Sequence, residues 1–159
     1  MKNLIVTIFM LITSFCFGQM KTEKIRLEIN YALRYENRIT IELDKNGNLI
    51  LEIEKNGGSL ICPSEEISRI TINKKIDSEE YKLLNIEIDK LGDEIRYDNV
   101  IGCDGESVLL SREFPAYSER FYFWSPSYNE NSRLLVMFNI ICKKILELAG
   151  LDIKNYWSK

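Results

Sequence analysis

The sequence predicts an α+β domain in which an antiparallel β-sheet of about 5–7 strands packs against a long C-terminal helix, with a second, shorter helix in mid-chain. Apolar and polar residues alternate through much of residues 25–72, as they do in strands with one buried face. Helical apolar spacing appears over residues 77–91 and again over residues 134–149. A sheet with one apolar face needs a covering layer, so we expect two layers, with the shorter helix at an edge or end of the sheet.

The first half of the chain predicts an antiparallel meander with one polar face. Residues 25–35 alternate almost without a break, and residues 39–43 and 49–53 repeat the same period. The sequence DKNGN (residues 44–48) separates the latter two, and it favours a hairpin turn because Asn and Gly tolerate positive φ. Residues 70–72 predict a further short strand.

The DKNGN segment also resembles the start of a calcium-binding loop. Such a loop needs oxygen ligands at alternate positions, a glycine at its sixth position and a bidentate glutamate at its twelfth. Counted from Asp44, these two positions hold Leu49 and Lys55, while Gly47 comes fourth. The sequence therefore favours a plain hairpin turn.

Two segments carry the signals of helices. Asp77 and Glu80 form a capping-box pattern, apolar residues follow at helical spacing, and Gly92 supplies a left-handed stop. The second segment has a wider apolar stripe and ends at Gly150. This stripe consists of Leu134, Leu135, Phe138, Ile141, Cys142, Ile145, Leu148 and Ala149. We expect it to cover one face of the sheet, and we expect the tail over residues 151–159, which contains aromatic residues, to dock on the domain.

An aromatic segment between the two helices offers a candidate contact surface. Residues 107–112 and 120–125 predict two strands, and the second is rich in aromatic side chains. In that strand the two phenylalanines face one side, and Tyr122 and Trp124 face the other. Either one pair points away from the core, or further layers cover both faces. An exposed Tyr122 and Trp124, flanked by Arg120, would form a binding surface, because rigid amphipathic rings dominate interface hot spots and also stack on sugars.

The N-terminus has the features of a cleavable secretory signal peptide over residues 1–18. Lys2 precedes an uncharged, mostly apolar run over residues 4–17. This run is shorter than the roughly 20 apolar residues that cross a bilayer. Small side chains at Cys16 and Gly18 then fit the pattern of a cleavage site.

Cleavage before Gln19 would release residues 19–159 as one domain, located in the periplasm or secreted, with no membrane span after signal cleavage. A lipoprotein processing site at Cys16 and an uncleaved membrane anchor are the alternatives. The lipoprotein site is disfavoured because the bulky Phe15 stands where such sites have a small residue.

The mature domain would keep Cys62, Cys103 and Cys142. An odd number of cysteines outside the cytoplasm leaves at least one thiol free or paired between chains. Cys142 lies in the apolar helix stripe, so we expect it to be the free one. Cys62 and Cys103 each lie beside turn residues, and a disulfide between them would stabilise the fold by about 4 kcal/mol through loop closure. Spacing alone does not bring their Cα atoms within about 7 Å, so the bridged and free states both stay open.

Composition argues against several classes of function. The chain has 21 Lys and Arg against 24 Asp and Glu, a net charge of −3, which disfavours nucleic acid and anionic membranes as partners. It has no histidine, which excludes Ser-His and Cys-His nucleophile pairs and every His-based metal site. No Ser-x-x-Lys sequence and no glycine-rich phosphate loop occur. We therefore expect no catalytic residues, no metal site and no cofactor.

The C-terminal half contains a succession of recognisable features. Asp104-Gly105 precedes a strand, Trp124-Ser125-Pro126 ends the next strand, and Leu148-Ala149-Gly150-Leu151 closes the long helix. In this succession the chain resembles small exported bacterial proteins of unknown function. The resemblance implies a periplasmic or secreted bacterial setting, and it carries over no catalytic residue.

These observations favour a non-catalytic binding module that recognises a protein or a cell-envelope component through an exposed sheet edge or the Trp124 region. An inhibitor or immunity-type protein would be a special case. A small hydrolase that works through paired carboxylates is an alternative, and it would need a concave pocket with a carboxyl of raised pKa. A carrier of a small apolar ligand is another, and it would need an apolar cavity between helix and sheet.

The signal-peptide prediction is tested by expressing the full chain in a bacterial host and measuring the mass of the exported protein. We expect an N-terminus at Gln19, and we expect Gly18→Leu to block cleavage, because the processing site requires a small residue there. An unprocessed protein that stays in the cytoplasm would contradict the prediction.

Overall fold

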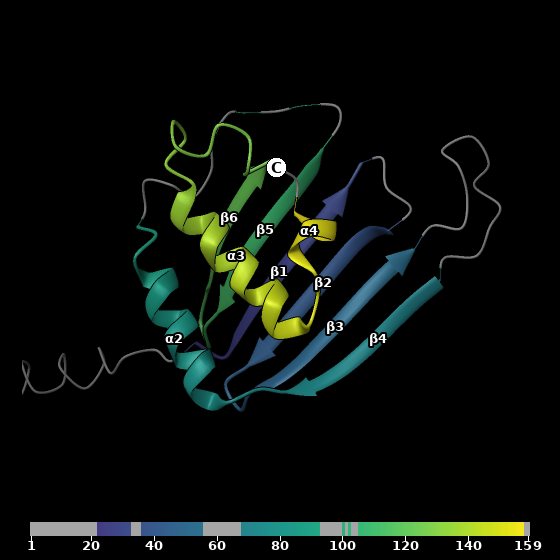
Figure 1. Ribbon diagram of the computed structural model, residues 1–159. Helices are drawn as coiled ribbons and strands as arrows, with labels where there is room; N and C mark the ends of the chain where they lie inside the picture. The colour runs from purple at the N-terminus through teal and green to yellow at the C-terminus, as the bar shows by residue number, and fades with distance from the viewer. Residues whose placement is uncertain are drawn as a thin grey trace, which may run out of the picture.

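The computed structural model describes residues 22–32, 36–55, 68–92, 100, 102 and 105–157. The strands are β1 (Lys24–Tyr31), β2 (Glu36–Asp44), β3 (Asn48–Lys55), β4 (Ser68–Lys75), β5 (Glu106–Glu113) and β6 (Ser118–Trp124). The helices are α2 (Ser78–Asp89), α3 (Val136–Ala149) and α4 (Ile153–Tyr156). The strands form one six-stranded antiparallel sheet in the order β4-β3-β2-β1-β5-β6. The helices lie on one side of it (Figure 1), which confirms the predicted α+β class.

Strand β1 shows why the two faces of the sheet differ. Its buried positions are Ile25, Leu27, Ile29 and Tyr31, and they alternate with Lys24, Arg26, Glu28 and Asn30. Ile29 lies between Ile39 of β2 and Val108 of β5, so the buried positions form rows that continue across the strands. The sheet therefore has an apolar face beneath the helices and a polar face on the opposite side, which we call the open face.

The turn between β2 and β3 has the hairpin conformation that the DKNGN sequence predicts. The Asp44 carboxylate accepts hydrogen bonds of 2.9 Å from the backbone N–H groups of Asn46 and Asn48. Gly47 has a φ of +78°, and a Cβ at this position would lie 2.5 Å from the carbonyl oxygen of Ile76. Both features are typical of a tight turn. The Asp44 carboxylate is hydrogen-bonded to backbone amides of the turn, and position 47 accommodates only glycine.

Helix α2 begins at its predicted cap, and both predicted helices end close to a glycine. The side chain of Asp77 accepts a 3.0 Å hydrogen bond from the N–H of Glu79 at the start of α2. Gly92 follows that helix with a φ of +68°, and Gly150 ends α3 with a φ of +83°. Glycine adopts this left-handed conformation at little cost, so Gly150 serves as the C-cap of α3, whereas α2 ends at Asp89, with Lys90 as its C-cap, shortly before Gly92.

Helix α3 supplies most of the cover for the apolar face. Its buried side chains are Phe138, Asn139, Ile141, Cys142, Ile145, Leu146 and Ala149. The ring of Phe138 packs edge-on against Phe123 of β6, with 4.7 Å between the ring centres. The predicted stripe also included Leu134, and this was wrong: Leu134 precedes the helix, has a φ of +57° and is 68% exposed. The left-handed backbone of Leu134 takes this residue out of the helical periodicity, whereas its neighbour Leu135, the N-cap residue, is fully buried as predicted.

The C-terminal tail docks on the domain as predicted. Trp157 is buried, and the hydroxyl of Tyr31 donates a hydrogen bond to the carbonyl of Tyr156. Cys142 is buried with a free thiol, and burial raises the pKa of that thiol well above its ordinary value. The proposed Cys62–Cys103 disulfide and the signal segment, residues 1–18, lie outside the described residues. Within the described ranges, no helix is long and apolar enough to cross a membrane.

The packing of α3 predicts a large difference between two neighbouring positions on the same helix. Replacing Phe138 by alanine should lower the free energy of unfolding by about 3–5 kcal/mol, because it removes a buried ring and leaves a cavity. Ile140→Ala is the matched control: Ile140 is half-exposed on the same helix, so its loss should cost less than about 1 kcal/mol. Urea denaturation of the three proteins measures this difference, and equal losses would contradict the assigned face of the helix.

Candidate functional site

The three predicted contact residues lie together on the open face of β6. Phe121 and Phe123 are buried beneath the helices, so the alternation of the strand directs Arg120, Tyr122 and Trp124 to the opposite side. Tyr122 is 52% exposed, and Arg120 is also exposed. The described residues therefore do not cover both faces of β6. We call Arg120, Tyr122 and Trp124 the β6 surface.

The backbone of the same residues faces the outer edge of the sheet. Among the strands that the structure describes, β6 is the last in the sheet, next to β5. The N–H of Ser125 donates a 2.7 Å hydrogen bond to the carbonyl of Glu106, in register with the β5–β6 pairing. Hydrogen-bonded pairs alternate along antiparallel strands, so odd-numbered residues of β6 direct their backbone groups toward β5. Arg120 and Tyr122 direct theirs outward, and thus offer both side chains and backbone groups to a partner.

Trp124 is half-buried because two glycines make room for its indole ring. A Cβ added to Gly102 would overlap the six-membered ring of Trp124. One added to Gly105 would lie 3.2 Å from Cζ2 of the same ring. Trp124 therefore packs against its own domain with part of its surface, while Tyr122 is the ring most available to another molecule.

Arg133 locks the end of β6, a role that the sequence analysis did not predict. Its guanidinium donates hydrogen bonds to the carbonyls of Trp124 and Ser125 at 2.8 Å each, and to that of Tyr128 at 2.9 Å. These bonds satisfy carbonyl groups at a strand end where Ser125 has a φ of +36°. An arginine shortly after a Ser-Pro turn is the only sequence signal, and it is too common to be diagnostic.

The neighbours of the β6 surface on β5 have shorter side chains. In the observed register Trp124 lies opposite Ser107, Tyr122 opposite Leu109, and Arg120 opposite Ser111. The four-residue connection after β5 sets this register, because the N–H of Phe114 donates a 2.9 Å hydrogen bond to the carbonyl of Tyr117. The Tyr122 ring therefore borders Leu109, which adds apolar area to the β6 surface.

Beyond β5 the open face carries paired charges. Glu28 on β1 accepts hydrogen bonds from Arg38 at 2.7 Å, Arg26 at 3.0 Å and Asn30 at 3.1 Å. Burial pushes the pKa of Glu28 upward, but the hydrogen bonds from Arg38 and Asn30 and the charges of the two arginines outweigh it, so the pKa lies below its ordinary value. Glu28 therefore stays ionised and forms a cross-strand ion pair with Arg38 of β2.

The two described carboxyl groups with shifted pKa values do not have the pKa of a general acid. Where the pKa of a described carboxyl is shifted, at Glu28 and at Asp44, it is lowered, whereas a general acid needs a raised pKa. Burial tends to raise the pKa of Asp44, but hydrogen bonds from Asn48 and Asn46 and the charge of Lys75 lower it. Among the residues that the structure describes, no three His, Cys, Asp or Glu side chains are grouped as metal ligands would be.

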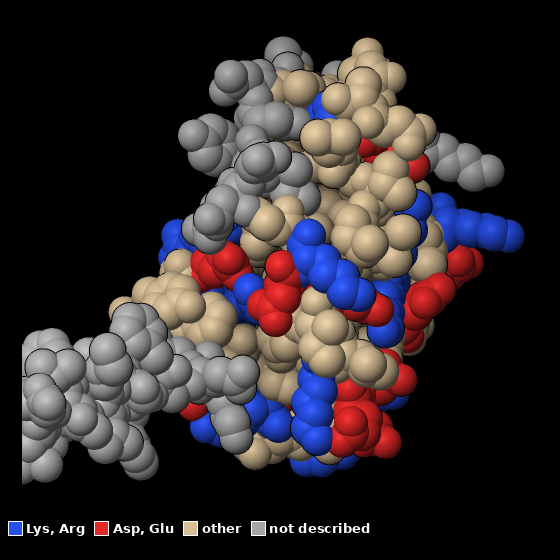
Figure 2. All heavy atoms as spheres, turned by 90° about the vertical axis from the view of Figure 1, so that its left-hand side faces the viewer, with Lys and Arg blue, Asp and Glu red and all other residues tan. Residues whose placement is uncertain are grey.

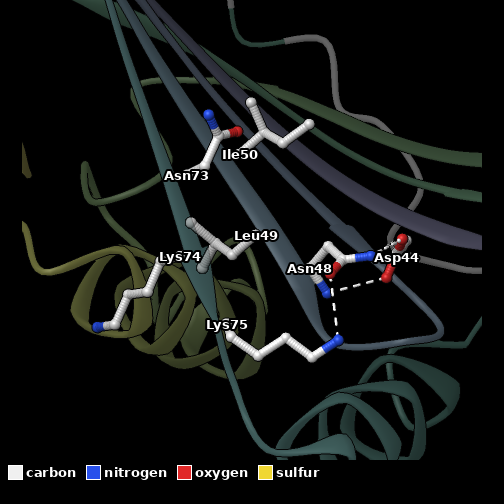
Figure 3. Close-up of a pocket in the computed structure, with 7 residues that line it drawn as sticks. All are labelled: Asp44, Asn48, Leu49, Ile50, Asn73, Lys74 and Lys75. Atoms are coloured by element: carbon white, nitrogen blue, oxygen red, sulfur yellow. Dashed lines mark hydrogen bonds between the residues drawn. The ribbon is translucent and has the colours of Figure 1, made fainter.

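A shallow pocket of about 470 Å³ lies at the far side of the sheet from β6, beside the β2–β3 turn (Figure 3). Its lining residues are Asp44, Asn48, Leu49, Ile50, Asn73, Lys74 and Lys75. Asn48 donates a 2.6 Å hydrogen bond to Asp44 and accepts one of 3.2 Å from Lys75. These polar groups bind one another, and the pocket is not the apolar helix–sheet cavity that a lipid carrier would need.

A second exposed apolar area surrounds the start of α3. Tyr128, Leu134, Val136, Met137 and Ile140 are all exposed there. In the side view of Figure 2 the upper part of the molecule is largely uncharged, whereas basic and acidic groups alternate lower down. This area is a second candidate contact site. Unlike the β6 surface, it does not combine an exposed side chain with strand backbone groups that point outward.

Comparison with known proteins does not assign the chain to a group: no family model matches it and no curated protein matches it. The functional proposal therefore rests on the chemistry of the surface alone.

The charged rows of the open face predict a pH dependence of stability. Because the pKa of Glu28 is lowered on folding from an ordinary value of 4.5, its stabilising effect is present above that value and is lost as the pH falls through the folded value. We therefore expect Glu28→Gln to be less stable than the wild type at neutral pH, with a difference that shrinks as the pH falls below 4.5. Urea denaturation across this range measures it, and a difference that grows on acidification would contradict the assignment.

The matched control is Glu79→Gln. Glu79 forms an exposed ion pair with Lys82 on α2, and such pairs contribute little to stability. Its stability difference from the wild type should stay near zero over the same pH range.

Proposed function

We propose that the chain is a non-catalytic binding module that contacts a protein partner through the β6 surface, in the periplasm or at the cell envelope. The observation that carries this proposal is the exposed ring of Tyr122, held beside Arg120 and Trp124 on an edge strand. The location rests on the predicted signal peptide. An inhibitor or immunity-type protein is one form that such a module takes.

The β6 surface has the composition of a binding hot spot. Tyr, Trp and Arg are the residues that most often dominate the energetics of interfaces, because they bury large areas at a small cost in side-chain entropy. Arg120 has no ion-pair partner among the described residues, so its guanidinium is available to a carboxylate of the partner. The ladder to β5 holds the strand rigid before contact, which reduces the entropy lost on binding.

Two features make the alternative functions less well supported. A carboxylate-dependent hydrolase needs a carboxyl of raised pKa, and the shifts at Glu28 and Asp44 go the other way. A carrier needs space between helix and sheet, but Phe138, Ile141 and Ile145 of α3 are fully buried against it. These features favour recognition by a surface over chemistry or storage in a cavity.

The proposal is tested by cross-linking the exported protein to its neighbours in the cell envelope and then measuring the Kd for the partner identified. Tyr122→Ala should weaken that binding by about thirtyfold, the loss expected for a hot-spot ring of about 2 kcal/mol. Tyr128→Ala is the matched control, because Tyr128 is 58% exposed but lies in the turn before α3. Its Kd should stay within about twofold of the wild type.

Equal binding by Tyr122→Ala and the wild type would reject the β6 surface. A large loss in Ile140→Ser, with Tyr122→Ala unaffected, would place the contact at the start of α3 instead. Trp124→Ala is less informative, because its indole also packs against Gly102 and Gly105 and its removal disturbs the fold.

A further inference from the structure

Strand β4, at the edge opposite β6, is exposed along its whole length. All eight of its residues are exposed, and no helix lies over it (Figure 1). Ile70 and Ile72 point to the helix side of the sheet, where they pair with the buried Ile53 and Leu51 of β3. They are nonetheless 43% and 47% exposed. The apolar face of the sheet therefore extends one strand beyond its helical cover.

The backbone of β4 offers unpaired hydrogen-bonding groups at alternate positions. The N–H of Ile76 donates a 2.8 Å hydrogen bond to the carbonyl of Gly47, in register with the β3–β4 pairing. Even-numbered residues of β4 therefore direct their N–H and C=O groups toward β3. Thr71 and Asn73 direct theirs outward, and among the described residues no strand pairs with this edge. Such a regular edge is a template for an added strand.

The positive charge of β4 determines which kind of strand can pair with this edge of the sheet. The strand SRITINKK contains Arg69, Lys74 and Lys75 and no acidic residue, although the whole chain has a net charge of −3. Arg69 pairs with Glu54, whereas Lys74 and Lys75 bond to the neutral oxygens of Leu148 and Asn48. Neither lysine forms a direct hydrogen bond to a carboxylate among the described contacts, although the charge of Lys75 acts on the nearby Asp44.

These charges disfavour a second copy of the chain as the added strand. Two β4 strands paired edge to edge would bring the three cations of each copy together, and like charges on neighbouring strands are destabilising. Cations on an edge also oppose uncontrolled aggregation. The same cations attract an acidic segment.

We propose that β4 binds an extended, acidic segment of a protein partner as an added strand of the sheet. Apolar residues of that segment would lie beside Ile70 and Ile72 on the helix side, and alternate acidic residues would lie beside Arg69 and Lys75 on the open face. The partner segment is thus recognised by a period-two pattern of apolar and acidic residues. This docking edge is separate from the β6 surface and does not depend on it.

The test uses a capped eight-residue peptide of alternating Val and Glu, titrated into the purified protein. A peptide of alternating Val and Lys is the control for charge, and we expect it to bind at least about tenfold more weakly. Hydrogen exchange of the complex should show new protection at the amides of Thr71 and Asn73. Equal binding of the two peptides, no binding of the acidic one, or protection on β6 instead would overturn the proposal.

Variants of β4 identify the mode of binding. Thr71→Pro removes an outward N–H, a change that an edge strand tolerates where the N–H faces solvent. Relative to the matched Thr71→Ala, it should weaken peptide binding by at least about tenfold, through the loss of edge hydrogen bonds. Similar affinities for these two variants would overturn strand addition.

Further variants keep the test valid if Thr71→Pro does not fold. Ile72→Thr should weaken binding several-fold, whereas Ile140→Thr, at a similarly exposed position on α3, should not. Equal effects of these two changes would also reject the site. A protein that dimerises without peptide, and becomes monomeric as Thr71→Pro, would show that a second copy occupies this edge.

Discussion

The contact between α3 and the apolar rows of the sheet decides which side of each strand another molecule can reach. Phe138 packs edge-on against Phe123. Because successive side chains of β6 point to opposite faces, Tyr122 and Trp124 then lie on the open face. A shift of one residue in the β5–β6 register would exchange the two sets. The candidate binding surface is therefore a consequence of core packing, although none of its exposed atoms belongs to the core.

The helices cover the sheet unevenly, which makes its two edges chemically different. Arg112 of β5 is buried and donates hydrogen bonds to Glu119 of β6 and Asp89 of α2, so it ties that helix to the β5–β6 side. At the other edge, Lys74 of β4 donates a 2.9 Å hydrogen bond to the carbonyl of Leu148 in α3. The β6 edge thus has a covered inner face and exposed rings, while β4 has exposed isoleucines on its inner face and cations along its length.

The charges of the open face act mainly within the sheet. Glu28 and Glu42 on neighbouring strands form ion pairs with Lys24, Arg26 and Arg38. By contrast, the ring of Tyr122 is exposed, and Arg120 has no ion-pair partner among the described residues.

Much of the secondary structure could be predicted from the sequence, because it depends on neighbouring residues. The alternation of β1, the turn at Gly47, the Asp77 cap and the stops at Gly92 and Gly150 each follow from local backbone preferences. The common side of Arg120, Tyr122 and Trp124 also follows, since it needs only the period of a strand. The exposure of Leu134 did not, because its place just before the helix depends on how the preceding turn packs.

The sequence by itself determined that Phe121 and Phe123 lie on one side of β6 and that Tyr122 and Trp124 lie on the other. It did not determine which side faces solvent. Only the tertiary structure decided this, since the choice depends on where α3 packs, and α3 follows β6 by a turn whose path no local pattern specifies. The same holds for β4: its period places Ile70 and Ile72 on one side, and they are exposed because the helices do not extend over the last strand. Local periodicity defines the faces of a strand, whereas burial depends on contacts between residues far apart in the chain.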